Sequence, residues 1–458
     1  MMVMGEVPEE VDIAVIGGGV GGYTAAIRAA ELGKSVVLIE KEKLGGHCLN
    51  YACIPSKTLI HISDIFYDST HSQKFGINAE KVTIDAKKML EWRVGVSTKL
   101  ENGVAFLCKQ NRIDVLKGEG TFIERNRIQV TDGTEVIFKK AIIATGSEPA
   151  ELSGMAFNGK TIIDYKQALL LDHIPKEMAI IGAGYVAVEI STMYAKLGSK
   201  VHVIARSDVL SKFDRDAVSI VKKHMQKLGI TIHAGANPKA YANGNLELDN
   251  GESISADVVV VAIGLRPFSD GLGTQTAGVE TDSKGFVKVN EKLQTSNPDI
   301  YAIGDVVGEP MLAHKSMRQG VVSAENAAGL GSSFDSLVIP AVIFSDPEIA
   351  IAGSVEEKEG IKVKKFPLSA LGRAIALDET DGFAKIAYDS DNIVVGIELV
   401  SPDANAAITE AALAIEMGAT LEDIADTIHP HPTYSESIKE VAEAALGRPI
   451  HFFYGAGT

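Results

Sequence analysis

Two segments of the chain share one hydrophobic pattern: a short apolar strand, a glycine-rich turn, an amphipathic helix and a second apolar strand. They are VDIAVIGGGVGGYTAAIRAAELGKSVVLIE (11–40) and MAIIGAGYVAVEISTMYAKLGSKVHVIAR (178–206). From about residue 337 the pattern changes to strand-like runs, VIPAVIF, FAKIAY and IVVGIELV, and then to helices such as 405–418. The sequence therefore predicts an α/β protein with two Rossmann-like dinucleotide-binding domains and a C-terminal α+β assembly domain.

Two further apolar strand patterns run into a glycine turn followed by proline, and we interpret them as domain boundaries. They are AIIATGSEP (141–149) and VVVAIGLRP (259–267). The predicted domains are 1–147 with the first nucleotide unit, 148–264 with the second, 265–336 as a central continuation of the first, and 337–458 for assembly.

The first glycine turn has the spacing of a dinucleotide fingerprint. Gly17, Gly19 and Gly22 fit G-x-G-x-x-G, and Glu40 ends the second strand. Such glycines turn the chain tightly, let the backbone approach a pyrophosphate and pack helix on strand, while the acid accepts a ribose hydroxyl. The complete pattern predicts dinucleotide binding.

The second turn repeats this fingerprint with Gly182, Gly184 and Ala187, so the chain is expected to hold two dinucleotides. Its second strand ends Ala205-Arg206-Ser207 and offers no acid to a ribose diol. Arg206 suits a 2′-phosphate instead. An ordinary solvated arginine explains the same residue equally well.

Two cysteines, Cys48 and Cys53, lie in GGHCLNYACIPSK (45–57), and the chain has only one other, Cys108. The start of a helix would bring this pair onto one face within bonding reach. Lys57 and the helix N-terminus would favour a thiolate. Two buried thiols or half of a zinc site are the alternatives, although the spacing is poor for zinc. With a fingerprint upstream, we predict disulfide redox chemistry beside a flavin. Cys108 is interpreted as a packing residue.

Asp305 ends an apolar strand in IYAIGDVV and precedes a helix that is predicted to begin near Ala313. A carboxylate here could hold a ribityl hydroxyl, and the helix N-terminus could face the pyrimidine end of a flavin. The alternative for Asp305 is an ordinary turn aspartate.

His431 lies between two prolines in IHPHPTYSE, and Glu436 follows it. His431 could be a general base whose other ring nitrogen is oriented by Glu436. Thr433 and Glu436 also fit a capping box that opens the last helix. His429 and His431 could indicate a metal, but no third ligand is apparent, so none is predicted.

Composition narrows the class of protein. The 458 residues are 46% hydrophobic and carry a net charge of −16, which disfavours nucleic acid and anionic membranes as partners. The opening MMVMGEVPEEVD lacks the regions of a signal peptide, and no run approaches the roughly 20 apolar residues of a membrane span. We expect a soluble, cytoplasmic protein whose disulfide is catalytic.

Several segments, in order, resemble the dihydrolipoamide dehydrogenase group of the pyridine nucleotide-disulfide oxidoreductase family. They are GGVGGYTAAIRAAELGKSVVLIE, GGHCLNYACIPSK, IYAIGDV, PMLAHK, FPLSALGRAIALDETDGFAKI and HPHPTYSE. The resemblance covers nearly the whole chain. It implies FAD in the first site, NAD or NADP in the second, and a homodimer formed by a C-terminal dimerisation domain. The implied partner is dihydrolipoamide or the lipoyl-carrying protein of a 2-oxoacid dehydrogenase-type complex.

The same resemblance implies roles for individual residues. Cys48 would be the interchange thiol that meets the substrate, and Cys53 the thiol against the flavin. His431 would be the base, held by Glu436 and supplied by the other subunit. Further contacts and positioning roles are implied for Lys57, which would lie near the flavin N5 and pair with Glu189, and for Thr145, Gly146, Gly264, Asp305 and Ala313.

Around the redox pair the chain departs from the family, with His47, Tyr51 and Ala52 where Thr, Val and Gly are usual. These changes bear on redox potential and flavin contacts, not on the reaction class. The predicted function is oxidation of dihydrolipoamide through the cysteine pair and FAD, with NAD(P)⁺ as acceptor. The alternatives are an NADPH-dependent reductase of a low-molecular-weight disulfide and a flavoprotein redox sensor, which would need no base like His431.

Overall fold

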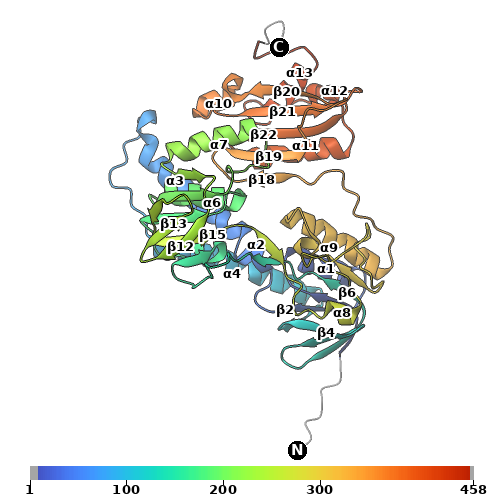
Figure 1. Ribbon diagram of the computed structural model, residues 1–458. Coiled ribbons are helices and arrows are strands. Elements are labelled where there is room, and N and C mark those ends of the chain that lie inside the picture. The colour runs from blue at the N-terminus through green and yellow to red at the C-terminus, as the bar shows by residue number, and fades with distance from the viewer. Residues whose placement is uncertain (1–8, 454–458) are drawn as a thin grey trace, which may run out of the picture. The chain divides into compact units, whose positions relative to one another are not determined.

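The computed structural model describes residues 9–453, which form two compact units, each built from two stretches of the chain (Figure 1). Unit 1 comprises the chain up to Pro175 and Val260–Asp335, and unit 2 comprises Lys176–Val259 and the chain from Ser336. Most of the opening segment used to argue against a signal peptide lies outside the described residues. Within 9–453, no helix is long and apolar enough to cross a membrane. The three predicted boundaries between the four domains stay predictions.

Unit 1 is built on a mainly parallel sheet with strand order β3-β2-β1-β6-β5-β4, and β17 also pairs with β6. Strand β2 is apolar because helices cover a parallel sheet on both faces. Helices α1 and α9 pack side by side, although they are far apart in sequence (Figure 1). The elements are β1 (Glu9–Ile16), α1 (Val20–Glu31), β2 (Val36–Glu40), α2 (Gly46–Asn50), α3 (Cys53–His71), η1 (Ser72–Phe75), α4 (Ala86–Gln110), β3 (Asp114–Lys117), β4 (Gly120–Glu124), β5 (Arg127–Val130), β6 (Glu135–Ile143), β7 (Ser147–Pro149), β8 (Ile162–Asp164), α5 (Tyr165–Ala168), β16 (Leu265–Pro267), α8 (Thr274–Ala277), β17 (Ile300–Ala302), η2 (Gly304–Val307) and α9 (Ala313–Ala328).

The first part of unit 2 is a second nucleotide-type layer. Strand β10 pairs in parallel with β9 on one side and β11 on the other. A small antiparallel sheet, β12-β13-β14, follows. The elements are β9 (Glu177–Ile181), α6 (Tyr185–Lys196), β10 (Lys200–Ala205), α7 (Arg215–Lys227), β11 (Thr231–Ala234), β12 (Pro238–Ala242), β13 (Asn245–Leu248), β14 (Ser253–Ser255) and β15 (Val258–Val261).

The second part of unit 2 is an antiparallel sheet with strand order β18-β19-β22-β21-β20, and helices α11 and α13 pack against it. The predicted strand FAKIAY is β21, and a capping box formed by Thr420 and Asp423 opens α12. The α/β class with a C-terminal α+β domain is confirmed. The elements are β18 (Ala341–Ile343), β19 (Glu348–Gly353), β20 (Lys362–Pro367), η3 (Leu368–Ala370), α10 (Gly372–Leu377), β21 (Phe383–Tyr388), β22 (Val394–Ser401), α11 (Ala404–Glu416), α12 (Leu421–Asp426) and α13 (Glu436–Ala445).

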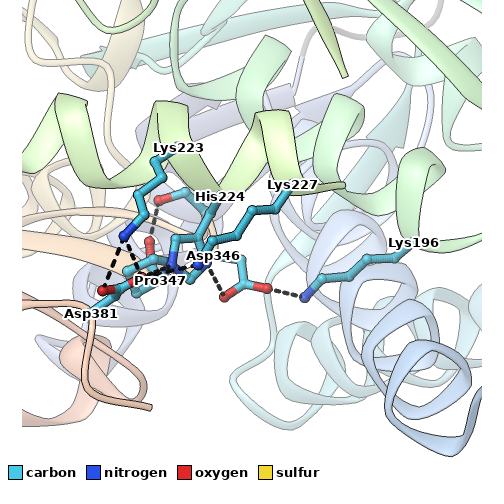
Figure 2. A network of polar contacts seen from close by, with 8 residues as sticks. Lys196, Lys223, His224, Lys227, Asp346, Pro347 and Asp381 are labelled. Carbon is cyan, nitrogen blue, oxygen red and sulfur yellow. Dashed lines mark hydrogen bonds and ion pairs between the residues drawn. The ribbon is translucent and has the colours of Figure 1, made fainter. Parts of the chain in front are cut away.

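Charged side chains join the two parts of unit 2. Lys223, His224 and Lys227, all on α7, converge on Asp381 at 3.2, 3.0 and 3.2 Å (Figure 2). This cluster lowers the pKa of Asp381 to about 2, with the hydrogen bond from His224 as the largest cause. Lys196 on α6 pairs with Asp346 at 2.7 Å. These ion pairs link the nucleotide-type layer to the segments that precede β19 and β21 of the C-terminal sheet.

Candidate active site

The first fingerprint forms a tight turn between β1 and α1. The Gly17 amide donates to the Ile39 carbonyl over 2.8 Å, and Gly17 has a φ of +101°, which favours glycine. A Cβ on Gly22 would overlap the Gly17 carbonyl oxygen. At Gly19, the residue before α1, a Cβ would instead point into open space. The open side of the turn at the N-terminus of α1 has the room and the exposed N–H groups that a pyrophosphate needs.

Glu40 lies beside this turn. Its two carboxylate oxygens accept hydrogen bonds from the backbone amides of Gly18, at 2.6 Å, and Glu42, at 2.7 Å. Burial raises the pKa of Glu40. The acid predicted to accept a ribose hydroxyl is thus fixed at the end of β2.

The segment with the two cysteines is tied to the same turn. The Gly45 amide donates to the Gly18 carbonyl over 2.8 Å, and a Cβ on Gly46 would come within 2.7 Å of the Gly19 Cα. This close backbone approach requires glycines and places the cysteine segment against the dinucleotide turn.

Cys48 and Cys53 do not lie at the start of a single helix, so that detail of the prediction is wrong. Cys48 lies in α2, which ends at Asn50, and Cys53 is the first residue of α3. The amides of Tyr51 and Ala52 both donate to the His47 carbonyl, at 2.8 and 2.7 Å, which reverses the chain between the two helices.

The two sulfurs still interact. A hydrogen bond with Cys53 is the largest cause that raises the pKa of the Cys48 thiol, and burial is the next. Cys53 lies at the N-terminus of α3, where the helix dipole favours a negative charge. Lys57 and Asp305 also act on Cys48 electrostatically, so these predicted residues lie near the pair.

An aromatic cluster beside the pair was not predicted. His47 packs edge-on against Tyr51, with ring centroids 6.0 Å apart, and its Nδ1 lies 3.5 Å from the hydroxyl of Tyr165. Burial, with Lys166 next, lowers the pKa of His47 to about 4. His47 is therefore a neutral imidazole at pH 7. Its departure from the family pattern was visible in the sequence, but its partner on α5 was not.

Asp305 lies on η2, where its Oδ2 accepts from the Ser147 hydroxyl over 2.6 Å. Burial is the main cause that raises its pKa. The helix predicted to begin near Ala313 is α9, which begins at that residue. The side chain of Gln319 accepts from the Gly304 amide over 2.8 Å and so ties α9 to the Asp305 segment. The buried Asp305 carboxylate near Cys48 is the kind of group that could hold a cofactor hydroxyl.

The two strand ends interpreted as boundaries meet in space. Strands β7 and β16 pair in antiparallel. Thr145 donates to the Phe268 carbonyl over 2.6 Å, and the Phe268 amide donates to the Gly146 carbonyl over 2.9 Å. Gly264, with a φ of +122°, accepts from the Ala150 amide. These residues are thereby joined at the edge of unit 1, but their cofactor contacts stay predictions.

The second fingerprint has the geometry of the first. The Gly182 amide donates to the Ile204 carbonyl over 3.0 Å, as Gly17 does to Ile39. A Cβ on Gly184, the residue before α6, would point into open space, and Ala187 is buried in that helix. By this correspondence Ala205 occupies the position that Glu40 has in the first site.

Glu189 on α6 is 4% exposed, and its Oε1 accepts from the Phe344 amide over 3.1 Å. Its predicted partner, Lys57, belongs to the other unit. The Lys57–Glu189 pair stays a prediction.

His431 and Glu436 form the predicted dyad. The Nδ1 of His431 lies 2.8 Å from Oε1 of Glu436, and the other oxygen of Glu436 accepts from the Thr433 amide over 2.8 Å. The capping-box alternative is wrong, because Ser435 is the residue that precedes α13 and no side chain caps the helix. The His431 side chain is 75% exposed, so its Nε2 is open to a substrate.

His429 has a different role. Its side chain is buried, Nε2 lies 2.8 Å from Glu410, and Nδ1 lies 2.9 Å from the Thr427 carbonyl. The hydrogen bond with Glu410 is the main cause that raises the pKa of His429. His429 therefore fixes the loop that contains it to α11, through Glu410.

Two dinucleotide turns with a cysteine pair tied to one of them define a nucleotide-dependent disulfide oxidoreductase. Residues 11–320 match the pyridine nucleotide-disulphide oxidoreductase family, and residues 339–442 match its dimerisation domain. The chain belongs to this family. It is an oxidoreductase that uses FAD and a pyridine nucleotide.

Similar proteins agree with this membership. The chain is 44% identical to the dihydrolipoyl dehydrogenase of Geobacillus stearothermophilus, covering 98% of this chain and 99% of that protein. It is 43% identical to the dihydrolipoyl dehydrogenase of Bacillus subtilis, with the same coverage. The fold is similar to that of the HOCl-induced flavoprotein disulfide reductase RclA of Escherichia coli, at a TM-score of 0.85 and 25% identity over 94% of this chain and 99% of that one.

Proposed function

We propose that this protein oxidises dihydrolipoamide to lipoamide through Cys48 and Cys53, with FAD and a nicotinamide dinucleotide as cofactors. The observation that carries the proposal is the cysteine pair tied to the first dinucleotide turn, together with a His431–Glu436 dyad whose Nε2 is open. The relatives named dihydrolipoyl dehydrogenase support the choice of substrate.

The chemistry follows from these groups. His431 Nε2 takes the proton of one substrate thiol, and the thiolate attacks Cys48 of the Cys48–Cys53 disulfide, so that Cys53 leaves as a thiolate. The second substrate thiol then attacks the mixed disulfide, and its proton passes to the Cys48 sulfur. This releases lipoamide and leaves Cys48 as a thiol, Cys53 as a thiolate and the first proton on His431. The substrate loses two electrons, and the cysteine pair gains them. FAD, when bound, supplies two-electron transfer between the reduced pair and the nicotinamide.

The residues of the first site that would hold FAD are Gly17, Gly19, Gly22, Glu40 and Asp305, joined by Thr145, Gly146, Lys57 and Ala313. The room at Gly19 and the buried carboxylate of Asp305 fit such a group. Gly182, Gly184 and Ala187 would hold the nicotinamide dinucleotide, with Gly264 and Glu189 beside it.

The direct test of this function is a steady-state assay of the purified holoenzyme. We expect dihydrolipoamide oxidation with NAD⁺ or NADP⁺ to exceed the reduction of glutathione disulfide or cystine in kcat/KM by at least tenfold. An enzyme that turns over only the low-molecular-weight disulfides with NADPH would be the reductase of the alternative reading, and one with no turnover would be a sensor.

The dimerisation domain supports a homodimer, and we propose that His431 acts on the cysteine pair of the other subunit. Mixed dimers of His431→Ala and Cys48→Ser would test this arrangement, because one of their two sites would combine an intact pair with an intact base. We expect about half of the wild-type activity per heterodimer. Heterodimers that form and stay inactive would disprove the shared site.

We further propose that the second site accepts NADP(H) at least as well as NAD(H). Ala205 stands where the first site has Glu40, so no carboxylate repels a 2′-phosphate. Arg206 follows directly; it is exposed and has no ion-pair partner among residues 9–453. A guanidinium is well suited to bind phosphate.

The lipoyl-carrying protein of a 2-oxoacid dehydrogenase-type complex is the proposed partner, and the cytoplasm is the proposed location. Co-sedimentation of the dimer with such a carrier protein, compared with the same carrier without its lipoyl group, would test the partner. Co-sedimentation that is equal for the carrier with and without its lipoyl group would contradict this partner.

A further inference from the structure

The segment between the two cysteines is held by a buried arginine from another helix. Arg93 lies on α4, is 3% exposed, and its guanidinium donates to the Asn50 carbonyl over 2.5 Å. Asn50 is the last residue of α2, the helix that carries Cys48, and Cys53 begins α3 shortly after it. All four residues belong to unit 1. The contact therefore fixes the backbone where α2 ends and the chain turns toward Cys53.

Asn50 also fixes the chain before Cys48. The residue is buried, and its side-chain NH₂ donates to the carbonyls of Leu44, at 2.9 Å, and Gly46, at 3.1 Å. Asn50 thus joins the start of α2 to its end, and Arg93 holds that end to α4. Because the backbone is held on both sides of Cys48, the disulfide with Cys53 can open and close without moving it.

Arg93 brings an unbalanced positive charge to this turn. A guanidinium keeps its proton in proteins. Within residues 9–453 Arg93 forms no ion pair, and its buried Nε has no hydrogen-bond partner there. Burial lowers the pKa of Arg93, and Tyr51 raises it. A buried charge without a counter-charge is costly, so a negative group that arises nearby during the reaction would be favoured.

The negative group that arises beside this turn is the Cys53 thiolate. Because Asn50 and Cys53 are so close in sequence, their Cα atoms lie at most about 11 Å apart. At that separation, with an effective dielectric constant of about 20, a unit positive charge strengthens a thiol as an acid on the order of tenfold. Arg93 also neutralises the Asn50 carbonyl, whose partial negative charge would otherwise disfavour a thiolate.

We infer that Arg93 is a positioning residue of the redox pair. It fixes the turn between Cys48 and Cys53 through the Asn50 carbonyl, and its charge favours the thiolate on Cys53. The inference rests on the proposed function, because it takes Cys53 as the thiolate of the reduced pair.

The test titrates the Cys53 thiol alone. In flavin-loaded Cys48→Ser the disulfide cannot form, so the pH dependence of a long-wavelength flavin band, and of the rate of Cys53 alkylation by iodoacetamide, gives the acid dissociation constant of this thiol. Adding Arg93→Gln should lower that constant at least tenfold, because glutamine can still donate to the Asn50 carbonyl but carries no charge. Adding Arg93→Lys, which keeps the charge, should restore it to within about threefold.

Arg127→Gln is the matched control. Arg127 is a partly exposed arginine of unit 1 that pairs with Glu135 at 3.1 Å, so its removal from the Cys48→Ser protein should change the constant by no more than about twofold. Arg93→Met is a second neutral variant, and it should lower the constant at least as much as Arg93→Gln does, because it also loses the donor to Asn50.

A dissociation constant that Arg93→Gln leaves unchanged, or that Arg93→Lys lowers as much as Arg93→Gln does, would overturn the inference. If neither neutral variant binds FAD, Arg93 serves folding alone, and the inference is overturned as well. Failure of the proposed function would appear separately, as the absence of dihydrolipoamide turnover in the wild type, because the titration of Cys53 needs no dithiol substrate.

Discussion

Glu436 needs two acceptor oxygens, because its single carboxylate faces two hydrogen-bond donors. Its Oε1 faces His431 Nδ1 and its Oε2 faces the Thr433 amide, each at 2.8 Å. A glutamine has only one acceptor oxygen. In Glu436→Gln, the side-chain NH₂ must face one of the two groups. If it faces the Thr433 amide, the two N–H donors repel each other. If it faces Nδ1, the imidazole proton must lie on Nε2, and His431 can then no longer act as the base.

The expected loss follows from the bond that is removed. A hydrogen bond to a charged group contributes about 1.5–3 kcal/mol, which corresponds to about 10- to 150-fold in rate. Because 75% of the His431 side chain is exposed, water screens the pair, and we expect the lower part of this range, about 10- to 30-fold in kcat for dihydrolipoamide.

Steady-state kinetics of the flavin-loaded variant measure this loss. Glu440→Gln is the control, since Glu440 lies on the same helix and forms a similar 2.8 Å pair with His451. It should stay within about twofold of the wild type. A kcat of Glu436→Gln equal to that of the wild type, or to that of the control, would refute the orienting role of Glu436.

Three further predictions concern separate parts of the chain. Cys48→Ser should show a long-wavelength absorption band with oxidised FAD, because Cys53 then carries an unpaired thiolate; Cys53→Ser should lack it, and the opposite pattern would reverse the two thiol roles. Arg206→Glu should raise the NAD(H)-to-NADP(H) ratio of kcat/KM at least tenfold, and a wild type strongly selective for NAD(H) would contradict the phosphate site. Burial, with Asp214 next, raises the pKa of Glu398 from 4.5 to about 8, so the folded state retains a proton that the unfolded chain loses. The free energy of unfolding should therefore fall as the pH rises from about 4.5 to 8, by up to about 5 kcal/mol. Thermal unfolding of Glu398→Gln should lack this pH dependence, and a pH dependence equal to that of the wild type would contradict the raised pKa of Glu398.

The sequence could predict what depends on local spacing. The Gly17 and Gly182 turns and the helix start at Ala313 follow from chain neighbours, and all three are present. The cysteine pair was predicted, but not the break at Tyr51–Ala52, because both paths fit the same five-residue separation.

Features that depend on tertiary placement could not be predicted. Thr433 and Glu436 have a spacing that fits both a capping box and a base-orienting pair, and only the fold shows that Glu436 turns to His431. The buried carboxyl of Glu398 looks like an ordinary strand residue in sequence. The contact between Arg93 and Asn50 joins two helices whose residues lie 43 positions apart along the chain.

The most direct test of dithiol oxidation through the cysteine pair is an anaerobic reaction of the oxidised holoenzyme with one equivalent of dihydrolipoamide and no nicotinamide. Lipoamide and alkylatable thiols would be quantified together by mass spectrometry after quenching with iodoacetamide. Before nicotinamide is added, we predict new alkylation at Cys48 and Cys53. After nicotinamide is added to complete turnover, we predict one lipoamide per chain. Cys48→Ser should show neither the new alkylation nor the lipoamide. Lipoamide formed at the wild-type rate by Cys48→Ser, or formed by the wild type without new thiols at this pair or reduced flavin, would contradict the account.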